Sequence, residues 1–203
     1  MYRLLAGLFA KELTKEKIVS FREGKGRQLL DALETVEAYA LIVRRLRVYF
    51  TRISNPEQAA LDLAESYAWN FHGVGGTHSA PLYASVYLSE SGATHQQVER
   101  ELRGIIRGQG LSSNDSEREP YDHLSVILEF IAWMDEHEDG IEQQADSKEI
   151  VERYLLSWLP AFVSQCQRAD KQGFYSDLAL VTLGFVEADF SQPGLKDIQA
   201  DKV

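Results

Sequence analysis

Cysteine, basic residues and long apolar runs are all scarce in this sequence, and each scarcity excludes a class of protein. The 203 residues include one cysteine, Cys166, so no intrachain disulfide can form, which favours a reducing compartment. Lys and Arg number 21 against 31 Asp and Glu, a net charge of −10. This balance argues against non-specific nucleic-acid binding, which needs basic surface. An acidic surface instead suits a cationic partner.

No apolar stretch reaches the roughly 18 residues that a membrane-spanning helix needs. The first ten residues are mostly apolar, but Lys11-Glu12 interrupts the run, and this pattern predicts an amphipathic helix rather than a secretory signal. We therefore expect a cytoplasmic protein without stable membrane insertion. At 44% hydrophobic residues, the chain can bury a sizeable core.

Motifs for catalysis and for metal binding are also missing. The five histidines show no zinc-helix spacing, and a lone cysteine cannot complete a thiolate site. There is no Gly-x-Ser-x-Gly elbow and no dinucleotide-binding glycine fingerprint. The glycine-rich run 73–76 follows a predicted helix and lacks the Gly-Lys-Ser/Thr ending of a phosphate loop, so we interpret it as a helix terminator. We expect no catalysis, no metal and no cofactor.

Helical periodicity dominates, and no segment alternates for long, which predicts an all-α fold. The one strand candidate, 85–88, is too short to support a sheet. We expect Pro160 to kink or split its helix and Cys166 to be a small core residue. The predicted helices are 2–12, a short helix capped by Thr14 and ended by Gly24, 28–51, one from Asn55-Pro56 to 73, one opened by a capping box at 94–97, one from Pro120, one behind a second box at 146–149, and 174–189.

The segment 119–123, Glu-Pro-Tyr-Asp-His, stands before a strongly apolar run. Proline is favoured in the first turn of a helix, so we expect a helix to begin near Pro120. The carboxylates of Glu119 and Asp122 would then lie at its positive end, and plain capping is the simplest interpretation of the Asp-His pair. The apolar residues behind it recur at i, i+3, i+4 and i+7 and predict one buried face: Leu124, Ile127, Leu128 and Ile131.

Residues 77–93 are the longest non-periodic piece, and such loops are often functional. Tyr83 and Tyr87 within it could each contact a ligand or pack inward to pin the loop, and both alternatives stay open. Four arginines near the end of the predicted 28–51 helix form a basic patch, interpreted as a solvated face with an anion site as the alternative: Arg44, Arg45, Arg47 and Arg52.

Two stretches have the composition of linkers, 111–119 and 138–145. We therefore divide one overall domain into an N-terminal helical half, 1–118, and a C-terminal helical half, 119–190, followed by a frayed tail, 191–203. A hinge near 111–120 would permit exchange of halves between protomers, so a domain-swapped homodimer is an alternative to a monomer.

The segment Glu119-Pro120-Tyr121-Asp122-His123-Leu124 resembles the E-P-x-D-H-L signature of the TorD/DmsD/NarJ family of redox-enzyme maturation chaperones. The stretches 63–67, 78–80, 83–88 and 173–176 are also similar, so the resemblance covers about residues 2–190. It implies a compact, cytoplasmic, all-α chaperone for trimethylamine N-oxide reductase. Such a chaperone binds the twin-arginine leader and the core of the apoenzyme. It assists insertion of the client's molybdenum cofactor and delays export until that step is complete.

The resemblance also implies a leader-binding surface. It transfers to six residues of this chain: Tyr83, Tyr87, Glu119, Pro120, Asp122 and His123. Carboxylates at the head of an apolar helix suit a ligand with two arginines followed by an apolar segment. The chain departs from the family by beginning its first helix almost at Met1 and by inserting Leu82 between the loop proline and Tyr83.

Two other functions remain as alternatives. Some family members bind GTP weakly, which would allow a nucleotide hydrolase in which Asp122 or Glu129 activates water. The second alternative is a purely structural dimerisation module.

Overall fold

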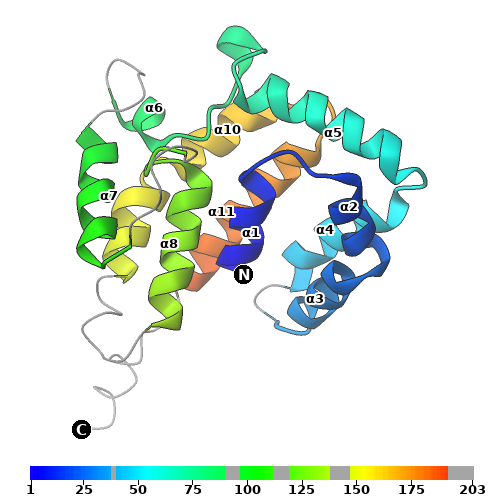
Figure 1. The fold of residues 1–203 in the computed structure, drawn as a ribbon, viewed down its shortest axis with the longest axis horizontal. Coiled ribbons are helices and arrows are strands. Elements are labelled where there is room, and N and C mark those ends of the chain that lie inside the picture. Colours follow the sequence, from blue (N-terminus) through cyan, green and yellow to red (C-terminus); the bar gives the residue numbers. More distant parts are fainter. Residues whose placement is uncertain (38–39, 90–96, 112–118, 138–146, 192–203) are drawn as a thin grey trace, which may run out of the picture. The chain divides into compact units, whose positions relative to one another are not determined.

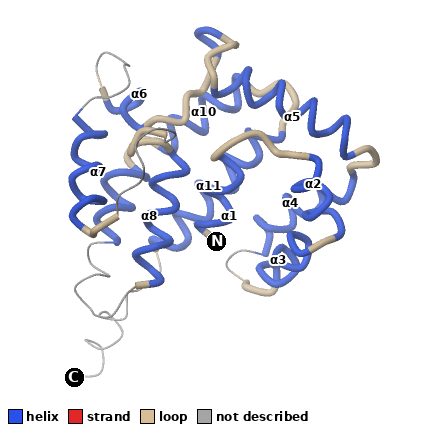
Figure 2. The backbone as a smooth tube through the Cα atoms, viewed as in Figure 1, coloured by secondary structure: helices blue, strands red, loops and turns tan. Residues whose placement is uncertain are grey.

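The computed structural model describes residues 1–37, 40–89, 97–111, 119–137 and 147–191. Within these ranges, all regular structure is helical apart from one isolated bridge between Tyr83 and His123 (Figures 1 and 2). This confirms the all-α prediction. No helix in the described ranges is long and apolar enough to cross a bilayer. The helices are α1 Tyr2–Phe9, α2 Lys15–Glu23, α3 Lys25–Glu34, α4 Ala40–Arg52, α5 Pro56–Phe71, η1 Gly76–His78, α6 Ala84–Leu88, α7 Gln97–Gly108, α8 Leu124–Glu136, a helical stretch 147–151 that continues as the π-helical η2 Glu152–Leu156, α10 Leu159–Ala169 and α11 Phe174–Phe190.

The chain divides into two compact units, each assembled from separated segments. The first unit comprises 1–10, 82–160 and 189–203, and the second comprises 11–81 and 161–188. The division into sequential halves, 1–118 and 119–190, stays a prediction, as does exchange of halves. Most of the expected hinge, 112–118, and of the tail, 192–203, lies outside the described residues.

In the first unit, α1 packs along α8 (Figure 1). The predicted buried face of α8 is confirmed, because its four residues are fully buried, and α1 contributes Leu5 and Phe9, which are also fully buried. At the exposed edge of this pair, the Arg3 guanidinium donates to both carboxylate oxygens of Glu136, at 2.6 Å each. Apolar burial therefore holds α1 on α8, and the exposed ion pair contributes little by comparison.

The second unit is organised around aromatic side chains. Phe21 of α2 stacks on Phe50 of α4 with ring centroids 4.8 Å apart, and Phe50 meets Phe174 of α11 edge-on at 5.9 Å. The carboxylate of Asp170 joins α5 to the start of α11, because it accepts from Ser66 Oγ at 3.2 Å and from the Ser176 N–H at 2.9 Å.

Several local predictions are confirmed. The Thr14 hydroxyl accepts from the Lys17 N–H, and α2 ends at Gly24. The Asn55 side chain accepts from the N–H groups of residues 57 and 58 at the start of α5. A turn separates η2 from α10, so Pro160 lies at the second position of a new helix. Cys166 is fully buried. Both predicted capping boxes begin outside the described residues.

Two of the predicted helix bounds in the N-terminal part of the chain are wrong. The expected helix 28–51 is two helices, because Thr35 ends α3. Its hydroxyl donates to the Ala32 carbonyl at 2.7 Å, and its N–H donates to the carbonyls of residues 32 and 33, a local competition that stops helices. The break lets α3 and α4 pack together and bury Leu30 and Val43. The first helix ends at Phe9, not at residue 12. The strand candidate 85–88, which we considered too short to support a sheet, is helical and lies within α6.

Candidate functional site

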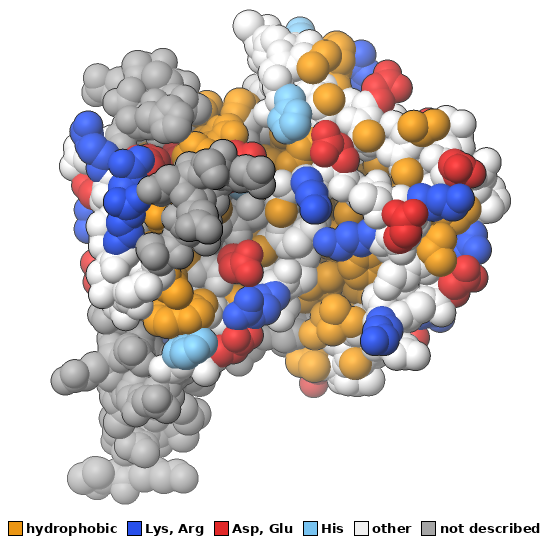
Figure 3. Space-filling model, in the orientation of Figure 1, with side chains coloured by type: hydrophobic (Ala, Val, Ile, Leu, Met, Phe, Trp, Pro, Cys, Tyr) orange, Lys and Arg blue, Asp and Glu red, His pale blue; other side chains and the backbone are white. Residues whose placement is uncertain are grey.

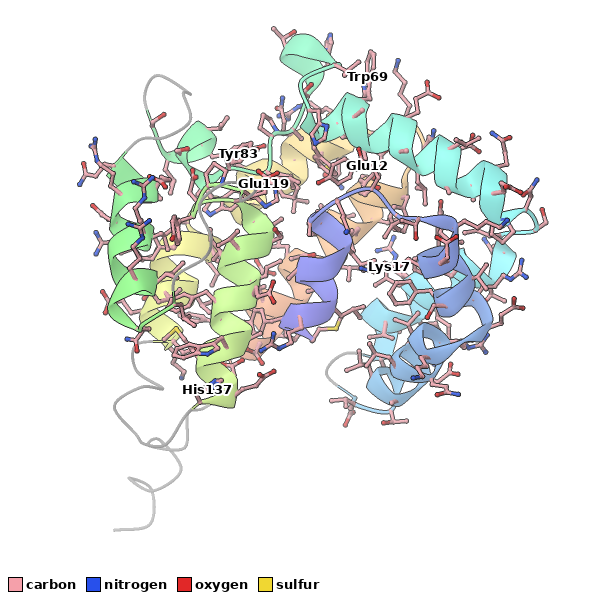
Figure 4. All side chains as sticks on the ribbon, in the orientation of Figure 1. Glu12, Lys17, Trp69, Tyr83, Glu119 and His137 are labelled. Atoms are coloured by element: carbon pink, nitrogen blue, oxygen red, sulfur yellow. The ribbon has the colours of Figure 1, made fainter. Side chains whose placement is uncertain are left out.

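The segment 119–124 meets the segment that leads into α6. The Ala84 N–H donates to the Asp122 carbonyl at 2.9 Å, and the Leu124 N–H donates to the Leu82 carbonyl at 2.7 Å. These two bonds flank the antiparallel bridge between Tyr83 and His123. The starts of α6 and α8 are therefore fastened together. Figure 4 shows the side chains of Tyr83 and Glu119 side by side at this junction.

Asp122 is fully buried. Its Oδ2 accepts from the Ser85 N–H at 3.0 Å and from the Ser85 hydroxyl. Its Oδ1 has no hydrogen-bond partner in the described part of the chain. The carboxylate thus caps α6, whereas we had expected it to lie at the start of its own helix, α8. Such a buried group is poorly placed to activate water, so the GTP alternative gains no support from it.

His123 is the residue that caps α8. Its Nδ1 accepts from the Ser125 N–H at 3.2 Å and lies 2.8 Å from Ser125 Oγ. The helix begins at Leu124, so the predicted start near Pro120 is wrong. The reason is a turn before the helix, in which the His123 N–H donates to the Pro120 carbonyl at 2.9 Å. With 2% exposure, the His123 side chain is not accessible to a partner in this structure.

The two loop tyrosines are half-buried. The Tyr83 hydroxyl donates to Glu119 Oε2 at 2.9 Å. Burial, and then this bond, raise the pKa of Tyr83 well above its ordinary value of 10.0. The Tyr87 ring stacks on the Trp158 ring with centroids 5.4 Å apart. Both rings therefore pack against the first unit and pin α6.

Beside this junction lies a groove with a volume of about 410 Å³, which we call the α8 groove. Two carboxylates, Glu119 and Glu129, lie among its lining residues. The side chain of Arg3 also lines it, with Nη1 at 3.4 Å from Glu129 Oε1. The larger apolar side chains that line it come from α7, α8 and the residue at 111: Ile106, Leu111, Val126, Phe130 and Trp133.

Of the six predicted leader-binding residues, Glu119 lines the α8 groove. Tyr83 holds Glu119, while Asp122 and His123 fix the helix starts on which it depends. Pro120 is half-buried in the turn. We did not predict the apolar wall of the groove, although Val126, Phe130 and Trp133 recur at i, i+4 and i+7. Leader binding itself stays a prediction.

The groove can accept a guanidinium next to a carboxylate, because Arg3 already provides that arrangement. The hydrogen bond from Arg3 lowers the pKa of Glu136 from its ordinary value of 4.5, so this carboxylate stays ionised at neutral pH. Glu129 has only the longer contact with Arg3 and is 65% exposed. Among the described residues, no group of His, Cys, Asp and Glu could hold a metal ion.

Comparison with known protein families shows to which family the chain belongs. A model of the nitrate reductase delta subunit family matches residues 28–164, which is most of the chain. The chain belongs to this family. The finding confirms the resemblance on which the leader-binding residues were assigned.

Several proteins of similar sequence align with almost the whole length of this chain. A protein named "Chaperone protein TorD" from Vibrio cholerae is 29% identical over 196 residues, which cover 93% of this chain and 88% of that protein. A protein of the same name from Shewanella sp. is 29% identical, covering 95% and 91%. A crystal structure named "Putative Redox Enzyme Maturation Protein" from Archaeoglobus fulgidus matches with a TM-score of 0.58 and 20% identity. It covers 92% of this chain and 94% of that one, and it supports the fold.

Proposed function

We propose that this protein is a cytoplasmic maturation chaperone for trimethylamine N-oxide reductase. It binds the twin-arginine leader and the core of the apoenzyme, assists insertion of the client's molybdenum cofactor and delays export until that step is complete. The names of the relatives that align with more than nine-tenths of the chain support the chaperone role. The same names support a chaperone rather than an enzyme.

One observation carries the leader-binding part, the combination of carboxylates and apolar side chains in the α8 groove. A twin-arginine leader offers two guanidinium groups followed by an apolar segment. Glu119 and Glu129 suit the first feature, and the wall formed by Val126, Phe130 and Trp133 suits the second. Arginine–carboxylate pairs orient the ligand because they can be bidentate.

The balance of energies favours a mainly apolar contribution to affinity. Each exposed ion pair should contribute about 1 kcal/mol or less. Burial of apolar surface contributes about 25 cal/mol per Å² before the costs of association are subtracted. The arginines would then set the register of the leader, and its apolar segment would supply most of the binding free energy. Arg3 would compete for Glu129, so a leader arginine has to displace or share that contact.

Calorimetric titration with the reductase leader peptide tests this proposal. We expect the wild type to bind, and the double variant Glu119→Gln/Glu129→Gln to bind several-fold more weakly. Replacing both arginines of the leader with alanine should weaken its binding to the wild type by a similar factor. The same replacement should weaken its binding to the double variant only slightly. Trp133 lies in the groove, so its fluorescence provides a second readout.

The matched control is Glu152→Gln, which removes one exposed carboxylate elsewhere in the first unit. Equal leader affinity of the folded double variant and the wild type would reject the groove as the site. Failure of the wild type to bind any form of the leader would reject the leader-binding function. Asp122 and His123 variants are unsuitable for assigning the site, because their loss would disturb the helix starts.

The client-directed part is tested by activation of purified apo-reductase with molybdenum cofactor. We expect this chain to increase the yield of active reductase, and an unchanged yield would contradict the maturation role.

A further inference from the structure

A second groove lies in the second unit, along the outer side of α4. Its volume is about 710 Å³, and we call it the α4 groove. Its apolar lining comes from Leu41, Val48, Tyr49 and Ile53. Figure 3 shows hydrophobic side chains lying next to Lys and Arg side chains over the part of this unit that holds α2 to α4.

The helix α4 has two apolar faces, of which one is already covered. Val43, Leu46 and Phe50 are buried in the second unit at 0%, 2% and 0% exposure. By contrast, Leu41 is 77% exposed and lines the α4 groove together with Val48. A large, exposed apolar side chain beside further apolar lining is typical of an interaction surface.

Cationic side chains alternate with the apolar ones on this face. Leu41, Arg45, Val48 and Arg52 follow at i, i+4, i+7 and i+11, so they form one stripe along the helix. The two arginines are therefore about 10.5 Å apart along the axis, two helical turns. The chain carries a net charge of −10, so a cationic stripe on this face needs an explanation.

The arginines of the stripe are incompletely neutralised within the chain. Arg45 pairs with Asp177 at 3.1 Å, but both side chains are more than half exposed. Arg52 has no ion pair with any residue that the structure describes. Nearby, Arg44 and Arg47 both pair with Glu34, at 2.8 and 2.5 Å, and Arg47 also lies 3.9 Å from Asp31. The stripe can thus accept additional negative charge.

We propose that the α4 groove docks an amphipathic helix of a partner protein that carries carboxylates two turns apart. These carboxylates pair with Arg45 and Arg52, while apolar side chains of the partner helix cover Leu41 and Val48. Charge complementarity favours an acidic partner and fixes its register. This surface uses no residue of the α8 groove, so the inference does not depend on leader binding.

The test uses the full chain and fluorescence anisotropy with a labelled, capped 18-residue peptide. The peptide carries leucines on one helical face and glutamates seven residues apart beside them, and a matched peptide carries lysines in place of the glutamates. The variant is Arg45→Glu/Arg52→Glu. Its control is Arg100→Glu/Arg168→Glu, which reverses two exposed arginines on α7 and α10.

We expect the wild type and the control to bind the acidic peptide, and the charge-reversed variant to bind it at least tenfold more weakly. The lysine peptide should prefer the charge-reversed variant, because the pairing is then restored with opposite signs. Leu41→Ser should also weaken binding, whereas Leu61→Ser, at an exposed leucine of α5, should leave it unchanged.

Three results would overturn the inference: no binding of the acidic peptide by the wild type, equal affinity of the folded charge-reversed variant, or an equal loss in the arginine control. A concentration-dependent dimer, seen by light scattering and abolished by Arg45→Glu/Arg52→Glu, would assign the groove to a second copy of the chain instead. Leader binding by the charge-reversed variant should match the wild type, which separates this test from that of the proposed function.

Discussion

Replacing Asp122 with alanine removes the buried carboxylate that fastens α6 to the start of α8. Two hydrogen bonds from Ser85 to this charged group are lost, and Ser85, which is fully buried, keeps an N–H and a hydroxyl without their acceptor. Each bond to a charged group contributes about 1.5–3 kcal/mol. Asp122 Oδ1 is buried without a partner among the described residues, so removal of the carboxylate also relieves an unfavourable burial.

The net effect should be a free energy of unfolding lower by about 2–5 kcal/mol, out of about 5–15 kcal/mol for a typical protein. For a chain of this size, the melting temperature should fall by about 2–4 °C per kcal/mol. In a double-mutant cycle with Ser85→Ala, the two substitutions should be non-additive by about 1–3 kcal/mol.

Trp158 provides the assay, because its ring stacks on Tyr87 of α6. In a background where Trp69 and Trp133 are phenylalanine, urea unfolding followed by fluorescence should report the loss of α6 packing. A change below about 0.5 kcal/mol, the range of ordinary surface substitutions, would refute the assignment of Asp122 as the clamp. Asp122→Asn should lower the free energy of unfolding less than Asp122→Ala does, because asparagine keeps an acceptor oxygen.

Three further predictions concern the second unit and α7. A Cβ at Gly26 would lie 2.7 Å from Phe21 Cδ1, so Gly26→Ala should destabilise the chain in urea unfolding by about 1–3 kcal/mol. Gly104→Ala, inside α7 with open space around it, should instead stabilise it by about 0.5–1 kcal/mol. Hydrogen bonds from Arg47 and Arg44 lower the pKa of Glu34 below its ordinary 4.5. Glu34→Gln should therefore destabilise at neutral pH, and the difference from wild type should vanish as pH falls from about 4.5 through the lowered pKa.

The sequence predicted those elements whose start or stop signals act within a few residues. Thr14 and Asn55 accept from backbone groups two or three residues ahead, so their helix starts were predictable. The break at Thr35 was not, because no glycine or proline marks it and threonine is compatible with a helix interior. There, the packing of α3 on α4 outweighs the continuous apolar pattern.

The candidate site was harder to predict because its contacts are distant in sequence. Asp122 and Ser85 are 37 residues apart, so the pattern around Asp122 indicated a cap but not the helix that it caps. The same limit explains the helix α6, because its first N–H groups, those of Ala84 and Ser85, donate to Asp122 rather than to a local cap. On α8, apolar residues occupy both the core face and the groove face, so periodicity alone could not separate Val126, Phe130 and Trp133 from the core.

The buried thiol of Cys166 has an experimental consequence. Burial, with a smaller contribution from the charge of Asp170, raises the pKa of this thiol well above its ordinary 9.0, and the reactive form of cysteine is the thiolate. An alkylating reagent should therefore modify the side chain only while α10 is transiently separated from its neighbours. Because Cys166 is the one cysteine in the chain, the rate of its alkylation measures how often the second unit opens. Any ligand that binds the closed form should lower this rate.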